Sequence, residues 1–350
     1  MKINQYYYII LLIIGVSCTN TANNKILFPT DNFTTIKGKQ ILPDLFIGQP
    51  LNMLLINNNL LLIDIYDGFE VTLINTKNKT SGRIAPKGEG PHEFLDIRNI
   101  TYNSRDNTLC IFDGMTRFCS FYKVINNEIS LNEYDFIDKI RFDNNYPYDI
   151  IPFDNKFITN GCFDQYQFAL LDKKGNNILD FGIYPGDKNG IEINGCFFLK
   201  NQTIITASPN QEHFVAAGVF HDQLVFYKNN DKLTKTKEYF SIDSKINTDL
   251  NKEGEAIQYS SSETPETTRT YRVLYPTNSY MYALYWGIKN KDIDKENICY
   301  ILKFDWNGNL KEGFKIEQRL KTFAIDEDKN CIYGITYSEE DESLLLQYDM

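Results

Sequence analysis

The feature that most constrains the fold is a repeat of short apolar strands separated by turns rich in Asn, Asp, Gly and Lys. Regular short strands with such turns are typical of all-β sandwiches, barrels and propellers. A repeated four-stranded unit favours a propeller over the other two. The sequence shows no long amphipathic helix, so we predict an all-β fold.

Six such units follow one another along the chain. They cover residues 53–85, 97–136, 149–183, 195–240, 273–316 and 322–348. In the second unit the outermost strand is predicted at 129–136. The fourth unit is less regular than the others, and the sixth stops after three strands.

The incomplete sixth unit predicts how the ring closes. Residues Phe33–Gln40 form an orphan strand at the other end of the sequence. Pairing this strand with the last unit would complete the sixth blade and cover exposed sheet edges. We therefore predict a six-bladed β-propeller in one domain, 33–350, with about 50 residues per blade.

The join between the first two units, GRIAPKGEGPHEFLDIRNITYNSRDNTLCIFDGMTRFCSFYKV, resembles the NHL-type propeller repeat. In that repeat G-x-G-x-x-x-F precedes the innermost strand, and an Asp ends the second strand. Glycine permits the tight reversal between blades, and an Asp can bond backbone amides in a hairpin turn. Phe94 would lie between neighbouring sheets. The matching positions are Gly88, Gly90, Phe94, Asp113 and Arg117.

A second stretch, SYMYALYWGIKN at Ser279–Asn290, resembles the "YAlYsG" segment of TolB-like six-bladed propeller lipoproteins of Gram-negative anaerobes. With the GEGPHEF loop and the N-terminus in the expected order, the resemblance covers nearly the whole chain. The family is largely uncharacterised, so the resemblance implies a fold and an exported lipoprotein. It implies no activity.

The first 17 residues predict a lipoprotein signal peptide. The apolar run Tyr6–Val16 is well short of the roughly 20 residues that a membrane-spanning helix needs. Small residues follow it, and Gly15-Val16-Ser17 before Cys18 resembles a lipobox, although Gly15 stands where Leu is usual. We predict lipidation of Cys18. The alternative is an ordinary secretory signal with an incidental cysteine.

Residues 18–32 would then form the lipidated start and a polar tether. Stable anchoring takes more than one acyl chain, which a diacylated thiol provides. No acidic cluster follows Cys18, which favours the outer membrane facing the periplasm over display on the cell surface. The expected partners are the membrane, through the anchor on Cys18, and an unknown envelope protein, peptide or glycan.

The excess of acidic over basic residues disfavours one class of partner. A net charge of −10 argues against nucleic acid, because binding nucleic acid requires a basic stripe. We expect a monomer. We also expect no cofactor and no metal, because the sequence has only three histidines and no CxxC pair.

Export would permit a disulfide. In TLCIFDGMTRFCSFY a hairpin turning at Asp113–Thr116 would place Cys110 opposite Cys119. A bridge between these two cysteines is therefore predicted as an alternative to two buried free thiols.

The loop Lys87–Phe94 is glycine-rich but lacks the spacing of a P-loop, so we predict a connector between blades. Connectors border the mouth of the channel, and this one would offer polar groups to a ligand there. The candidate ligand-facing residues are Lys87, Glu89, His92, Glu93 and Arg98.

Two further segments each allow two interpretations. The aromatic residues of 271–286 could stack on a sugar or peptide, but alternation along a strand sends about half of such side chains into the core. The polar stretch 241–270 could be a lid over one face or a disordered excursion.

The function favoured by these observations is a lipid-anchored periplasmic propeller. It would act as a binding or scaffolding module for a peptide, glycan or envelope protein. The alternative is a hydrolase or lyase that acts on an envelope or imported glycan or peptide at a channel site, since propellers host both. The sequence identifies no catalytic residue.

Overall fold

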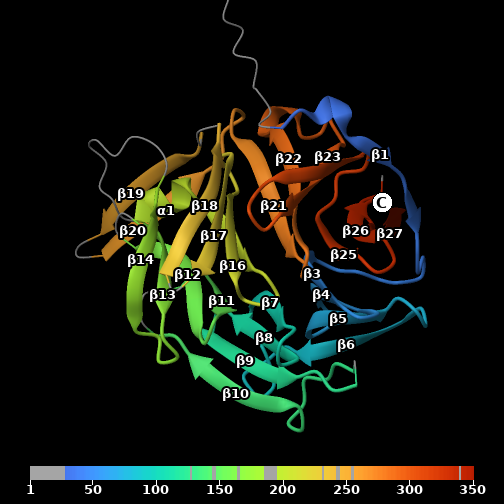
Figure 1. Ribbon diagram of the computed structural model, residues 1–350, viewed down its shortest axis with the longest axis horizontal. Coiled ribbons are helices and arrows are strands. Elements are labelled where there is room, and N and C mark those ends of the chain that lie inside the picture. Colours follow the sequence, from blue (N-terminus) through green and yellow to red (C-terminus); the bar gives the residue numbers. More distant parts are fainter. Residues whose placement is uncertain are drawn as a thin grey trace, which may run out of the picture.

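The computed structural model describes residues 28–126, 128–143, 147–163, 166–184, 195–230, 232–241, 245–253, 256–338 and 340–350. Their strands form six antiparallel blades arranged around a central axis (Figure 1). The fold is therefore an all-β six-bladed propeller, as predicted. The predicted signal peptide, Cys18 and most of the predicted tether lie outside the described residues.

Each blade runs outward from the axis in chain order. Blade 1 consists of β3 (Pro50–Ile56), β4 (Asn59–Tyr66), β5 (Phe69–Asn75) and β6 (Thr80–Pro86). Blade 2 consists of β7 (Ile97–Asn103), β8 (Thr108–Asp113), β9 (Phe118–Lys123) and β10 (Phe136–Arg141). Blade 3 consists of β11 (Asp149–Phe153), β12 (Lys156–Phe163), β13 (Tyr166–Leu171) and β14 (Asn177–Ile183).

The second half of the chain repeats this pattern. Blade 4 consists of β15 (Thr203–Ala207), β16 (His213–Gly218), β17 (Gln223–Asn230) and β18 (Lys232–Phe240). Blade 5 contains β21 (Thr268–Pro276), β22 (Tyr280–Lys289), β23 (Cys299–Asp305) and β24 (Leu310–Ile316). Blade 6 contains β25 (Thr322–Asp326), β26 (Cys331–Tyr337) and β27 (Ser343–Asp349).

The N-terminal segment closes the ring through two blades. Strand β1 (Thr34–Ile36) pairs in parallel with β24 as a fifth strand of blade 5. Strand β2 (Gly38–Gln40) pairs antiparallel with β27 and supplies the missing fourth strand of blade 6. The predicted orphan strand is therefore two short strands. Phe28, which precedes the predicted boundary at residue 33, is also part of the packed fold, because it is buried between Tyr239 and Phe304.

The turns after the innermost strands explain why the sequence repeats Asn and Asp. Asn57, Asn107, Asn155 and Asn330 have φ between 52° and 59°, in the left-handed region. Asn tolerates this conformation better than most residues with a Cβ. The same residue type therefore marks the first hairpin of blades 1, 2, 3 and 6.

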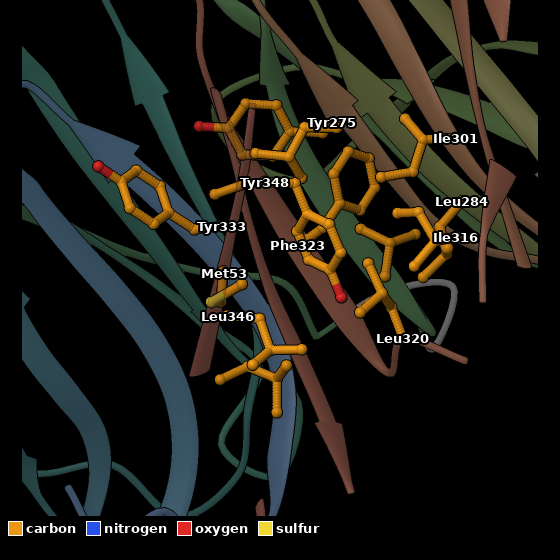
Figure 2. Close-up of a cluster of buried hydrophobic side chains, with 14 of the residues drawn as sticks. Met53, Tyr275, Leu284, Ile301, Ile316, Leu320, Phe323, Tyr333, Leu346 and Tyr348 are labelled. Atoms are coloured by element: carbon orange, nitrogen blue, oxygen red, sulfur yellow. The ribbon is translucent and has the colours of Figure 1, made fainter. Parts of the chain in front are cut away.

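The core lies between the blades. Phe94, Ile63 and Ile111 belong to the cluster that joins blades 1 and 2. Figure 2 shows the cluster that joins blades 5, 6 and 1, with side chains from β21, β25 and β3 in contact. Because each cluster takes side chains from neighbouring blades, no blade is packed alone.

Two elements differ from their sequence predictions. The outermost strand of blade 2 is β10, not 129–136. Ile129 and Leu131 are buried in the core cluster without forming a strand, which explains why their apolar pattern was misleading. Residues within 241–270 form a hairpin of β19 (Asn247–Glu253) and β20 (Ala256–Ser262). It lies at the rim beside α1 (Gly195–Lys200), away from the axis (Figure 1). Among the described residues, no helix is long and apolar enough to span a membrane.

Candidate functional site

The innermost strands surround an axial channel. A cavity of about 280 Å³ is lined by residues of β3, β7, β15, β21 and β25 and of the turns that follow them. We call the end at which these strands begin the upper end, and the end at which they finish the lower end. The two ends differ in charge and in access.

The lower end is crossed by the hairpin turn of blade 2. The Ser104 amide donates to the Pro209 carbonyl of blade 4 at 3.2 Å, and Arg105 pairs with Glu212 at 2.9 Å. Asp326, Glu327 and Asp328 line the cavity at this end. Contacts between blades therefore restrict the lower end, and its lining is acidic.

Polar and aromatic side chains gather at the upper end, where the innermost strands begin. The Arg98 guanidinium lies 5.4 Å from the centre of the Tyr148 ring. Asn99 donates to both carboxylate oxygens of Asp149, each at 3.1 Å. Tyr148, directly before β11 of blade 3, is 44% exposed and lies within electrostatic range of Arg98 of blade 2 and of Arg272 of blade 5. These residues form the candidate site, which we call the upper rim: Arg98, Asn99, Tyr148, Asp149 and Arg272.

Asp149 is the most perturbed acid of the upper rim. Burial raises its pKa to about 7. Hydrogen bonds from Asn99 and the Ile150 amide and the nearby charge of Arg98 lower the pKa, but by less than burial raises it. A carboxyl with such a pKa can hold or release a proton near neutral pH. The upper rim could therefore bind a polar ligand or exchange a proton with it.

The predicted ligand-facing loop divides in the structure, and only Arg98 reaches the upper rim. Lys87 pairs with the buried Glu70 at 2.9 Å. Glu93 accepts from the Gly90 amide at 2.8 Å, so its carboxylate holds the loop itself. His92 packs against Tyr122 and Phe136 on the outer strands of blade 2, and Glu89 is exposed.

The motif residues occupy structural positions at the same join. Phe94 is 2% exposed and lies in the core cluster between blades 1 and 2. Asp113 accepts from the Leu95 amide at 2.7 Å and from the Met115 and Thr116 amides at 3.0 Å. Gly88 and Gly90 lie against Glu93, where a Cβ would come too close to its carboxylate. Arg117 has a φ of 60° in the hairpin turn and donates to the Asp143 carbonyl at 3.4 Å.

The register predicted for the two cysteines is wrong. Cys110 lies opposite Phe121, and Cys119 lies opposite Phe112. The turn is centred between Met115 and Thr116, which moves the cysteines to diagonal positions two residues apart in register. Both are buried free thiols, with the Cys119 thiol hydrogen-bonded to Cys110.

The aromatic group at 271–286 belongs mainly to the core. Tyr271, Tyr275, Tyr282, Tyr285 and Trp286 are all buried. The sequence did not single out Tyr148, Asp149 or Arg272. Arg272 alone carried a signal, since a charged residue interrupts the apolar innermost strand TYRVLY.

In the part of the chain that the structure describes, no three His, Cys, Asp or Glu side chains come together as a metal site. The comparisons with known proteins agree with the fold. The sequence profile of the family described as "TolB-like 6-blade propeller-like" matches residues 31–328. No curated protein matches the chain.

Two solved structures resemble the chain over most of its length. One is a protein from Bacteroides fragilis described as exported, with 14% identity and a TM-score of 0.51, covering 92% of this chain and 97% of that one. The other is a DUF4221 family member from Bacteroides vulgatus, with 9% identity and a TM-score of 0.53, covering 90% and 98%. At these identities the likeness concerns the fold alone.

Proposed function

Because the chain belongs to the TolB-like six-bladed propeller family, we propose that it is an exported, lipid-anchored envelope protein that binds a ligand at its upper rim. The ligand would be a peptide, a glycan or another envelope protein. The signal-like N-terminus and Cys18 support export and anchoring, and the Bacteroides fragilis relative is described as exported.

The observation that carries the binding proposal is the convergence of Arg98, Tyr148 and Arg272 from three blades at one end of the axis. Binding sites combine apolar surface with a few placed polar groups. The upper rim offers both, whereas the turn of blade 2 crosses the lower end.

Pull-down from envelope extracts tests the proposal. We expect Tyr148→Ala to lose a component that the wild-type protein retains. Tyr134→Ala is the matched control, because Tyr134 is 86% exposed on the linker before β10 and is not part of the upper rim. Equal retention by both variants would contradict binding at the upper rim.

One observation favours a second function. Asp149 has a pKa of about 7 beside Arg98 and Tyr148, which suits a general acid or base in a hydrolase or lyase. Asp149→Asn keeps the shape of the side chain and removes its titration. Turnover of an envelope glycan or peptide by the wild-type protein, lost in Asp149→Asn with binding retained, would replace the binding role by the enzymatic one.

A further inference from the structure

Three cations surround one tryptophan on the upper face between blades 5 and 6. The guanidinium carbons of Arg272 and Arg319 lie 4.8 Å and 5.2 Å from the centre of the Trp286 ring. The Lys321 ammonium lies 5.7 Å from Trp286 and 4.6 Å from the centre of the Tyr337 ring. We call Arg272, Arg319, Lys321 and Trp286 the cation cluster.

The fold holds these side chains in place. The pairing of β21 with β22 shifts register between Tyr271 and Val273, so Arg272 stands at a β-bulge, a feature that redirects a side chain. In the linker to blade 6, Leu320 is buried and its carbonyl accepts from the Trp286 indole at 2.9 Å. Arg319 donates to the Ile293 and Glu296 carbonyls, which fixes its guanidinium.

Within the described part of the chain, the three cations of the cluster form no direct ion pair with an acid. Among the ion pairs of the described residues, none includes Arg272, Arg319 or Lys321. The neighbouring Arg269, in contrast, pairs with Glu263 at 2.9 Å. The protein as a whole carries a net charge of −10, which makes three unpaired cations at one place notable.

Burial and the neighbouring charges shift the pKa of the three cations. Burial lowers the pKa of Arg272, Arg319 and Lys321, and their cationic neighbours lower it further. Glu263 at Arg272, Asp294 at Arg319 and Asp341 at Lys321 act in the opposite direction and raise the pKa. An anion placed among the three cations would relieve their repulsion, because charge interactions strengthen where water is partly excluded.

Resting on the proposed binding function, we infer that the cation cluster binds an oxyanion of an acidic glycan. Planar guanidinium groups match carboxylate, sulfate and phosphate groups, and Lys321 adds a third donor. Tyr337 is 37% exposed beside Lys321, and Tyr148 is exposed at the upper rim. Such ring faces suit sugar rings, whereas an acidic peptide would need only the charges.

Trp286 provides a direct readout of binding. The chain contains two tryptophans, so Trp306→Phe leaves Trp286 as the sole indole. We expect an acidic oligogalacturonate to change the fluorescence of this protein, and a neutral oligogalactoside of equal length to bind at least roughly tenfold more weakly. Rising NaCl should weaken binding of the acidic sugar, because the partly exposed cations are screened.

Charge variants measured by calorimetry complete the test. Arg272→Gln and Lys321→Gln should each weaken oligogalacturonate binding roughly tenfold or more, while Arg272→Lys, which keeps the charge but loses the planar guanidinium, should weaken it less than Arg272→Gln. The matched control is Arg105→Gln at the lower end, which should bind like the wild-type protein. Circular dichroism confirms that each variant is folded.

Each contrary result has a distinct meaning. Equal binding of acidic and neutral sugars, unaffected by Arg272→Gln, would overturn the oxyanion inference and leave binding at the upper rim standing. Binding of polyglutamate but not of oligogalacturonate would overturn the glycan as ligand. A response to inorganic phosphate or sulfate alone would do the same. If Tyr148→Ala and Tyr134→Ala retained the same components in the pull-down, the proposed function would instead be contradicted.

Discussion

At the scale of single residues, burial and charge oppose each other most directly at Asp149. Its carboxyl is held by Asn99 and the Ile150 amide, yet burial raises its pKa to about 7. The ordinary value for an aspartate is about 3.9. A folded-state pKa above the unfolded one means that folding favours the protonated form, so stability is complete below pH 4 and is lost as pH rises to about 7.

Asp149→Asn should therefore change how stability depends on pH. We expect the variant and the wild-type protein to be about equally stable at pH 4. Above pH 7 the variant should be more stable, by roughly 2 kcal/mol after allowance for partial exposure. Thermal unfolding followed by circular dichroism between pH 4 and pH 8 measures this difference. Parallel curves for the two proteins would show that Asp149 is solvated as an ordinary aspartate.

A second residue-scale prediction concerns the loop Lys87–Phe94. A Cβ on Gly88 would come within 2.1 Å of Glu93 Oε2, the atom that accepts from the Gly90 amide. Gly88→Ala must displace that carboxylate and should cost roughly 1–2 kcal/mol in unfolding free energy. Gly82→Ala is the matched control, since nothing lies within 4 Å of its Cβ position. Equal stability of the two variants in urea denaturation would exclude the proposed role of Glu93.

The residues show which features a sequence can predict. Phe94 and Asp113 followed from local motifs, because a turn and a blade junction depend on nearby chain. Arg98, Tyr148 and Arg272 come together at the upper end from blades 2, 3 and 5, and Arg272 is more than 120 residues from the other two. Their convergence depends on how the ring closes, and no local pattern contains it.

At the scale of elements, the two N-terminal strands have different roles in closing the ring. Strand β1 adds to a blade that already has four strands, whereas β2 completes a blade that has only three. The strand repeat predicted this closure because an incomplete unit leaves an unpaired edge. It did not predict the break at Lys37, since three-residue strands carry little periodic signal.

Strand β2 should be sensitive to proline. Lys39→Pro removes a backbone donor within the pairing of β2 with β27, and we expect a loss of roughly 2 kcal/mol in unfolding free energy. Lys37→Pro, between β1 and β2, is the matched control and should cost less. Chemical denaturation compares the two variants. If Lys37→Pro were the more damaging, blade 6 would not depend on β2 for closure.

At the scale of the whole molecule, the channel is polarised. The upper end carries the cation cluster and Arg98, which pairs with Asp96 at 2.6 Å. The lower end carries Glu327, Asp328 and Asp326, which pairs with Lys329 at 2.7 Å. An acidic protein with one basic pole attracts an anion to that pole and repels it elsewhere. This difference in charge adds to the direction that the innermost strands already give the ring, since they all begin at the upper end.

The predicted lipid anchor on Cys18 would decide where the propeller acts. Phe28 packs against Tyr239 of β18 and Phe304 of β23, between blades 4 and 5. If Cys18 is lipidated, Cys18→Ser should move the protein from the membrane fraction to the soluble fraction. Its thermal midpoint should stay unchanged, because residues from Phe28 onward build the propeller.

Immunoblotting of separated fractions measures the shift, and Cys299→Ser, at a buried thiol, controls for the loss of a cysteine. Membrane retention of Cys18→Ser would instead mean that the apolar run 6–16 or a protein partner holds the ring in place.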